Sequence, residues 1–236
     1  SPWFDCSCCP SNLSRFIPSV AGYAYAVKEN DVYLNLYINS KVSIPVSGSE
    51  LQLATTSSYP WTGDLTFEVL NEKALEARLL LRIPGWARDE ALPSDLFRFT
   101  ESAEETISVA INGKKVEFRV EQGYILRPGF WKKGDRISLS LPMEDRIIEA
   151  HDQVEAKTGL MAVQHGPLVY CAEEIDNRVD VLEAGVGKNA RFSAGYREDL
   201  LGGVNVLEGE GMVLVPYSAW ANREVGKMNV WFKGKE

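Results

Sequence analysis

Short runs in which apolar and polar residues alternate dominate the chain from residue 32 onward. In the first run, Val32, Leu34 and Leu36 alternate with Tyr33 and Asn35, which is typical of a strand with one buried face. Further strand-like runs follow at residues 42–46, 51–55, 65–70 and 79–83. Proline and glycine separate these runs, so the pattern predicts a series of short β-strands.

An Asn-Gly pair at residues 112–113 separates two alternating runs, 107–111 and 116–120. Asn-Gly between such runs predicts a β-hairpin, because both residues tolerate the positive φ of a tight turn. Another alternating run, 137–141, follows a Lys-Gly-Asp turn at 133–135. Many short strands without a repeated strand–helix rhythm predict antiparallel β-sandwiches.

The alternation weakens at residues 142–158, where charged residues cluster. We expect a domain boundary and a solvated loop here, because charged residues are mostly exposed and nothing in their spacing indicates a catalytic pair of carboxylates. Residues 161–170 then predict a strand interrupted by Gly166 and Pro167. Residues 176–211 are rich in glycine and predict loops, and residues 228–232 predict a last strand.

The start of the chain has a different pattern, with apolar residues at helical spacing. Leu13, Phe16, Ile17 and Val20 lie at i, i+3, i+4 and i+7, which predicts one face of a short helix. Pro10 suits the first turn, Ser11 or Asn12 is the expected cap, and Pro18 limits how far the helix runs.

Three of the four cysteines, Cys6, Cys8 and Cys9, directly precede this helical pattern. A helix N-terminus favours a thiolate over a thiol, which suits either a nucleophile or a metal ligand. A Cys8–Cys9 disulfide is disfavoured, because adjacent Cα atoms lie only about 3.8 Å apart. A Cys6–Cys9 bridge, buried structural thiols, and a zinc site with a fourth ligand from elsewhere all stay open.

Composition narrows the classes of partner. The 236 residues are 45% hydrophobic and 25% charged, which is ordinary for a globular protein. A net charge of −8 and a pI near 5.0 would repel a nucleic-acid duplex. No apolar run reaches the length of a membrane span. We therefore expect neither a nucleic-acid nor a membrane partner.

The remaining candidate residues have plainer interpretations. His165 continues the strand face of Met161 and Val163, which favours a hydrogen-bonded core or rim histidine over a metal ligand. Cys171 is expected to be a small buried hydrophobe. Six tryptophans offer surfaces for sugar stacking, although most are expected in sandwich cores, at positions 3, 61, 86, 131, 220 and 231.

Several motifs resemble those of one enzyme family. They are CCPSNLSR at 8–15, GYAY at 22–25, VYLNLY at 32–37, GY at 123–124, WKKGD at 131–135, HGPLVY at 165–170, VPY at 215–217, WANR at 220–223 and MNVW at 228–231. Together they resemble glycoside hydrolase family 127, the β-L-arabinofuranosidase-like enzymes. The likeness spans nearly the whole chain, and the double cysteine is its most specific part.

This resemblance implies an (α/α)6 barrel followed by two β-sandwiches, of which the chain holds only the end. Residues 1–26 would be the last barrel segment, and residues 27–142 the first sandwich, completed by 225–236. Residues 143–224 would form the second sandwich. The expected fold is therefore mainly β, with two antiparallel sandwiches after a short helix.

The resemblance also implies a chemistry for the cysteines. Cys8 would be a zinc-bound thiolate nucleophile and Cys9 a second zinc ligand. A glutamate and another cysteine would complete the zinc site from upstream, and an upstream glutamate would be the general acid. The parent enzyme would be a retaining hydrolase that removes terminal β-L-arabinofuranosides, and the chain alone would be inactive.

The alternative function is a non-catalytic module that binds carbohydrate or braces the barrel. The partner expected under the enzymatic interpretation is a plant-derived oligosaccharide or glycoside, and a homodimer is left open. A redox or metal-storage role for the cysteines is a third hypothesis.

Overall fold

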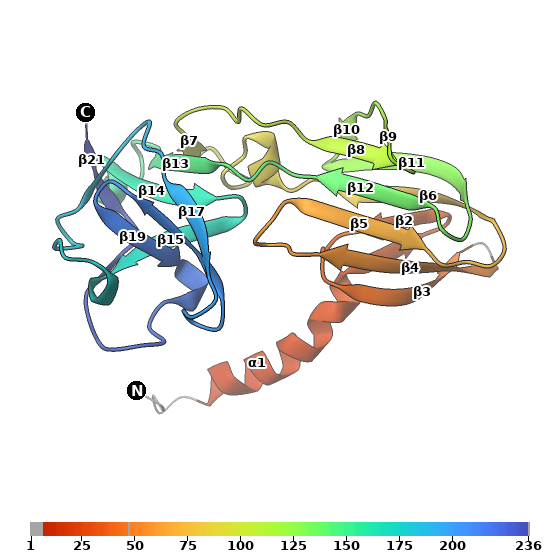
Figure 1. Ribbon diagram of the computed structural model, residues 1–236, viewed down its shortest axis with the longest axis horizontal. Coiled ribbons are helices and arrows are strands. Elements are labelled where there is room, and N and C mark those ends of the chain that lie inside the picture. Colours follow the sequence, from red (N-terminus) through yellow and green to blue (C-terminus); the bar gives the residue numbers. More distant parts are fainter. Residues whose placement is uncertain (1–6, 47, 236) are drawn as a thin grey trace. The chain divides into compact units, whose positions relative to one another are not determined.

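A computed structural model describes residues 7–46 and 48–235. Within this part the chain is mainly β, as predicted, and contains one α-helix (Figure 1). The chain divides into two compact units. No helix in the described part is long and apolar enough to cross a membrane.

The first unit comprises Ser1–Ser57, Leu65–Ile83 and Val109–Ser138. It begins with α1 (Cys8–Ser19) and a 3₁₀ turn, η1 (Val20–Tyr23). One sheet contains β1 (Tyr25–Lys28), β2 (Asp31–Leu34), β6 (Leu75–Arg82), β10 (Val120–Glu121) and β11 (Tyr124–Trp131). The other contains β3 (Ser40–Val46), β4 (Ser49–Ser57), β5 (Asp64–Val69), β8 (Ser108–Ile111), β9 (Lys114–Lys115) and β12 (Arg136–Ser140).

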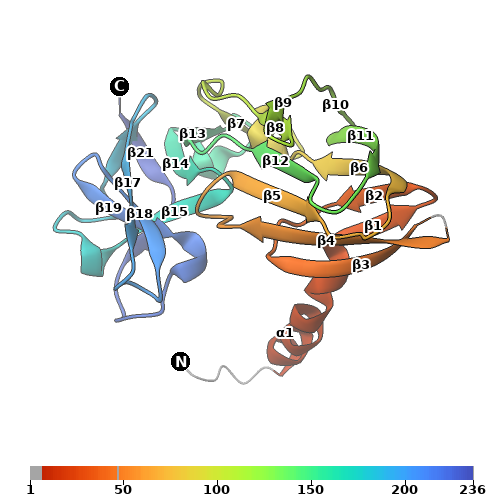
Figure 2. The same cartoon turned by 45° about the vertical axis from the view of Figure 1, so that its right-hand side comes forward.

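The strand orders are β1-β2-β6-β11-β10 and β3-β4-β5-β12-β8-β9 (Figure 2). The pair β2–β6 runs parallel, whereas β6–β11 and β3–β4 run antiparallel. In the longer strands alternate residues are buried, as Leu79 and Leu81 show in β6. Period-two alternation puts these side chains on one face of the sheet, where they form the core of the unit.

The second unit comprises Ser58–Asp64, Pro84–Ser108 and Leu139–Glu236. Its strands are β7 (Phe97–Phe99), β13 (Asp145–Ala150), β14 (Leu160–His165), β15 (Leu168–Glu173), β16 (Gly185–Gly187), β17 (Ser193–Arg197), β18 (Val204–Gly209), β19 (Met212–Pro216), β20 (Met228–Asn229) and β21 (Phe232–Lys235). Four 3₁₀ turns lie between them, at Gly85–Arg88, Glu155–Lys157, Glu174–Asp176 and Tyr217–Ala219.

These strands form one sheet with the path β16-β21-β14-β15-β19-β18-β17. Beside this path, β13 pairs with β14 and β7, and β20 pairs with β15. The core on this sheet includes Val163, Tyr170 and Leu214, all fully buried. Burial raises the pKa of the Tyr170 hydroxyl well above its ordinary value, and the nearby Asp145 carboxylate adds to the rise.

The last strand corrects one expectation. We expected residues 225–236 to complete the first sandwich, but β21 pairs with β14 and β16 in the second unit. The reason is Phe232, which is fully buried in the second core and lies opposite Met161 of β14. Phe232 is the one buried residue of β21, and the local sequence does not indicate which core receives it.

The charged segment 142–158 was interpreted only partly correctly: residues 145–150 form strand β13, whereas residues 151–158 form turns that are mostly exposed. Arg146 is buried in β13, stacks at 3.9 Å over the ring of Phe99 and donates to Asp89 at 2.9 Å. Buried charges that have partners can occupy a strand, so charge alone is a poor sign of a loop.

Two further expectations need adjustment. Residues 176–211 were predicted to be loops but contain β16, β17 and β18. All five residues of β17 are exposed, so its sequence has no alternation of apolar and polar residues. The hairpin at residues 112–113 forms, with positive φ at both Asn112 and Gly113. Its second strand, however, is only the two residues of β9.

Asp135 ties two turns of the first unit together. Its carboxylate accepts from the backbone N–H of Lys132 at 2.9 Å and from the Asn112 amide at 3.0 Å. The Asn112 oxygen in turn accepts from the Arg136 backbone N–H at 2.8 Å. The Lys132 backbone N–H lowers the pKa of Asp135 below its ordinary value, burial opposes this, and Asn112 adds to the lowering.

Because the folded-state pKa of Asp135 is lowered, its contribution to stability is present above the unfolded pKa of about 3.9 and is lost as pH falls through the folded value. Asp135→Asn should therefore reduce the free energy of unfolding at pH 7 by about 1 kcal/mol, with the difference from wild type vanishing near pH 2. Urea unfolding across this pH range measures it. Glu121→Gln, at an exposed carboxylate of the same unit, is the control, and a difference that persists at pH 2 would contradict the assignment.

Gly63 illustrates a backbone approach that only glycine permits. A Cβ at this position would lie 2.0 Å from the carbonyl oxygen of Leu141, whose N–H donates to Gly63. Gly63→Ala should reduce the free energy of unfolding by about 1–3 kcal/mol, because a backbone atom has to move. Gly187→Ala, where a Cβ would meet nothing within 4 Å, should be close to neutral. Thermal unfolding of both variants tests the contrast, and equal midpoints would refute it.

Candidate functional site

The cysteine pair lies inside the first turn of α1 and not ahead of it. The helix begins at Cys8, preceded by Ser7, which makes no side-chain cap. The expected caps are therefore wrong: the Ser11 hydroxyl donates back to the carbonyls of Ser7 and Cys8 from within the helix. Pro10 does occupy the first turn, and the helix ends at Ser19, one residue after Pro18.

Cys8 and Cys9 present their sulfurs together at the surface. The two Sγ atoms lie 3.7 Å apart and both residues are exposed. A disulfide bond is about 2.05 Å long, so none joins this pair. In a tetrahedral zinc site with Zn–S bonds of about 2.3 Å, two sulfurs lie about 3.8 Å apart. The spacing of the pair therefore fits two corners of such a site.

The described residues supply only part of a metal site. No group of three or more His, Cys, Asp or Glu side chains suited to a metal ion occurs among residues 7–46 and 48–235. Cys6, the third cysteine of the cluster, lies outside the described residues, as does Trp3. The assignment of Cys8 as nucleophile and of Cys8 and Cys9 as zinc ligands therefore stays a prediction.

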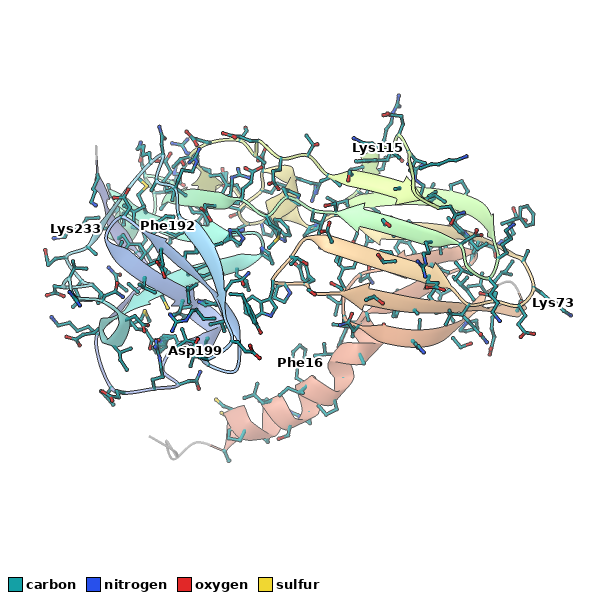
Figure 3. All side chains as sticks on the ribbon, in the orientation of Figure 1. Phe16, Lys73, Lys115, Phe192, Asp199 and Lys233 are labelled. Carbon is teal, nitrogen blue, oxygen red and sulfur yellow. The ribbon has the colours of Figure 1, made fainter. Side chains whose placement is uncertain are left out.

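The apolar face of α1 is formed as predicted but is not buried. Leu13, Phe16 and Ile17 are 56%, 57% and 65% exposed, and no residue of the helix is buried. Phe16 is labelled on α1 in Figure 3. Cys9 borders the same open hollow as Leu13 and Phe16. An amphipathic helix is normally stabilised by covering such a face, so the thiols stand next to a surface suited to another element.

Cys171 has the structural role expected of it. It is fully buried in β15, with Val206 and Val215 in the same cluster. Burial raises the pKa of its thiol to about 12, and the nearby Glu173 carboxylate adds to the rise. A thiol that is neither accessible nor ionised is a poor nucleophile.

The two histidines differ in what surrounds them. His151 is exposed, and its Nδ1 accepts from the Gln153 backbone N–H at 3.1 Å. His165 is a rim histidine, as predicted, and its Nδ1 lies 2.8 Å from Oδ1 of Asp145. The two residues face each other across β13 and β14. Sequence reasoning missed this partner, because nothing local indicates which strand will lie beside His165.

The tryptophans are less buried than we expected, because only one of the five in the described part of the chain is buried. Trp131 is buried and donates to the Ala77 carbonyl at 3.0 Å. Trp231 packs against Phe97. Trp220 is more exposed and stacks with Tyr217 at a centroid distance of 6.0 Å.

Comparison with known proteins extends the resemblance over the whole chain. Residues 31–143 match the model of the β-L-arabinofuranosidase GH127 middle domain, and residues 145–233 match that of the glycoside hydrolase family 127 C-terminal domain. A non-reducing end β-L-arabinofuranosidase of Bifidobacterium longum subsp. longum is 31% identical, over 97% of this chain and 37% of the relative.

Solved structures agree. The structure of a GH127 β-arabinofuranosidase has a TM-score of 0.92 and 37% identity, covering 100% of this chain and 40% of that one. A GH127 β-L-arabinofuranosidase from Geobacillus stearothermophilus T6 has a TM-score of 0.86 and 33% identity, covering 99% and 38%.

The chain thus spans about two fifths of the length of these relatives. Its two matched segments are adjacent and follow the family's order of middle and C-terminal domains. Because these matches cover most of the sequence and the fold agrees throughout, the chain belongs to glycoside hydrolase family 127.

Proposed function

We propose that this chain is the C-terminal part of a retaining hydrolase that releases terminal β-L-arabinofuranosyl groups from plant-derived oligosaccharides or glycosides, with Cys8 as its nucleophile. The observation that carries the proposal is the pair of exposed thiols, 3.7 Å apart in the first turn of α1. Membership of the family supports the substrate class, because the relatives are named β-L-arabinofuranosidases.

The proposed chemistry makes both thiols zinc ligands and makes Cys8 the nucleophile as well. Cys8 and Cys9 would hold a zinc ion, which, when bound, keeps a coordinated thiol in the thiolate form at neutral pH. Sγ of Cys8 attacks the anomeric carbon, so that an S–C bond forms while the glycosidic C–O bond breaks and the leaving oxygen takes up a proton. Water then attacks the same carbon, releases Sγ and gives its proton to a base. Two displacements at one carbon account for retention.

The acid–base group and the other zinc ligands would come from the rest of the enzyme, since the chain covers about two fifths of its relatives. The exposed face around Leu13 and Phe16 supports this division, because a helical barrel segment would cover it. In this proposal the chain by itself has no turnover.

Alkylation of the chain tests whether the exposed thiols and the buried thiol differ in reactivity in solution. Iodoacetamide at pH 8 should modify Cys8 and Cys9 in the native chain, and Cys171 at least about 100-fold more slowly, because it is buried and its pKa is raised to about 12. Peptide mapping by mass spectrometry follows each site. Urea should bring Cys171 to the rate of the others, and equal rates in the native chain would contradict the assignment.

Turnover by the protein that joins this chain to the remaining part of the family fold tests the nucleophile. Cys8→Ser should lower kcat on an aryl β-L-arabinofuranoside by at least about 1,000-fold, since removing a hydrolase's nucleophile has effects of this scale or larger. Cys9→Ser should also lower the bound zinc, measured by atomic emission. Cys171→Ala is the matched control and should keep both activity and zinc.

The alternative, a non-catalytic carbohydrate-binding or bracing module, makes the opposite prediction. Under that function Cys8→Ser leaves turnover unchanged, and Cys8 would have no part in the mechanism.

A further inference from the structure

The second unit contains a polar cavity of about 310 Å³. It is lined by residues of β13, by His165 at the end of β14, and by two loop segments around Glu101 and Arg191. A cavity of this size holds about ten water molecules at roughly 30 Å³ each, and lies at the lower end of the range for small-molecule sites.

A carboxylate fixes the orientation of the histidine that lines the cavity. Oδ1 of Asp145 lies 2.8 Å from Nδ1 of His165, and Oδ2 of the same carboxylate accepts from the Phe192 backbone N–H at 2.9 Å. A carboxylate only accepts hydrogen bonds, so Nδ1 of His165 carries the proton that is donated to it. When the ring is neutral, Nε2 is then an acceptor. It has no hydrogen-bond partner within the described part of the chain.

His165 is only 8% exposed, yet it lines the cavity. Nε2 is not among the fully buried side-chain atoms of the described residues that lack a hydrogen-bond partner, so this nitrogen is accessible and can accept from a ligand. Ser102 also lines the cavity but makes no hydrogen bond to His165 within the described residues, so the dyad holds no nucleophile. The geometry therefore suits binding rather than hydrolysis.

The other polar groups of the cavity are held mainly by one another. The Glu144 carboxylate accepts from the backbone N–H groups of Glu104 and Glu105, and Glu105 accepts from the Met143 N–H at 3.0 Å. Arg191 donates to Glu101 at 2.9 Å. This network fixes acceptors and donors around the space without using all of their capacity.

The side chains that line the cavity favour some classes of ligand over others. Five carboxylates and three cationic side chains line the cavity, which disfavours an anion. No described group of three His, Cys, Asp or Glu side chains suits a metal ion. Hydroxyl groups both donate and accept, so a neutral polyol satisfies a lining of this mixed kind. Phe192, labelled in Figure 3, adds a half-buried aromatic side chain to the lining, which suits the C–H groups of a sugar ring.

We propose that this cavity binds one neutral sugar unit, with Nε2 of His165 accepting a hydrogen bond from a sugar hydroxyl. The choice of a neutral pentose as the first probe rests on the proposed function, whereas the site itself rests on the cavity. The site belongs to the second unit and does not involve Cys8.

Calorimetric titration of the chain with L-arabinose and with a neutral arabino-oligosaccharide tests the site. We expect saturable binding, weakened at least about fivefold by His165→Asn, because that variant removes Nε2 while its amide still donates to Asp145. His151→Asn is the matched control and should bind as wild type. Galacturonic acid, which has a similar ring but carries a carboxylate, should bind more weakly than the neutral sugars.

Three additional measurements test this proposal, and the first of them distinguishes it from the proposed function. Cys8→Ser should bind the sugar with wild-type affinity, whatever its effect on turnover. Phe192→Leu, which keeps an apolar side chain, should also weaken binding. It is the second test of the site if His165→Asn does not fold. In ¹⁵N-labelled chain the Nε2 resonance of His165 should shift on saturation. No saturation by either neutral sugar, or equal affinities in wild type, His165→Asn and Phe192→Leu, would overturn the proposal.

Discussion

A sheet or helix with an apolar face has to cover that face, and this requirement organises the molecule. In both units the strands meet it internally, with side chains such as Leu79 in the first and Val163 in the second fully buried. Helix α1 does not meet it, because Leu13, Phe16 and Ile17 remain exposed. Cys8 and Cys9 lie on this helix, none of whose residues is buried, and the proposed chemistry therefore depends on residues beyond it.

The sequence predicted features that depend on local patterns. The alternation of Val32 and Leu34 predicted a strand, and Asn112-Gly113 predicted a turn because both residues tolerate positive φ. The helical spacing from Leu13 to Val20 also predicted α1. Each of these signals lies within a few residues, where backbone sterics and side-chain period act directly.

Features that depend on distant partners could not be predicted in this way. Arg146 is buried because Asp89 and Phe99 receive it, and Asp145 is fixed because His165 and the Phe192 backbone lie beside it. None of these pairs is recognisable from spacing, so a buried strand was interpreted as a loop. The prediction that residues 225–236 complete the first sandwich was wrong for the same reason, because Phe232 lies in the second core. The double cysteine was visible as a motif, but its 3.7 Å spacing came only from the helix that holds it.

The exposed pair of thiols has a consequence for handling the protein. Neighbouring residues of a helix cannot readily close a disulfide ring with each other, so air oxidation of Cys8 or Cys9 needs a thiol from elsewhere, and an exposed thiol of another molecule can supply it. Copies joined in this way would run as a covalent dimer on a non-reducing gel, and would lose that band in reductant. Any claim about native oligomeric state therefore has to be made on reduced chain, since a sulfur–sulfur link between two copies would imitate an assembly.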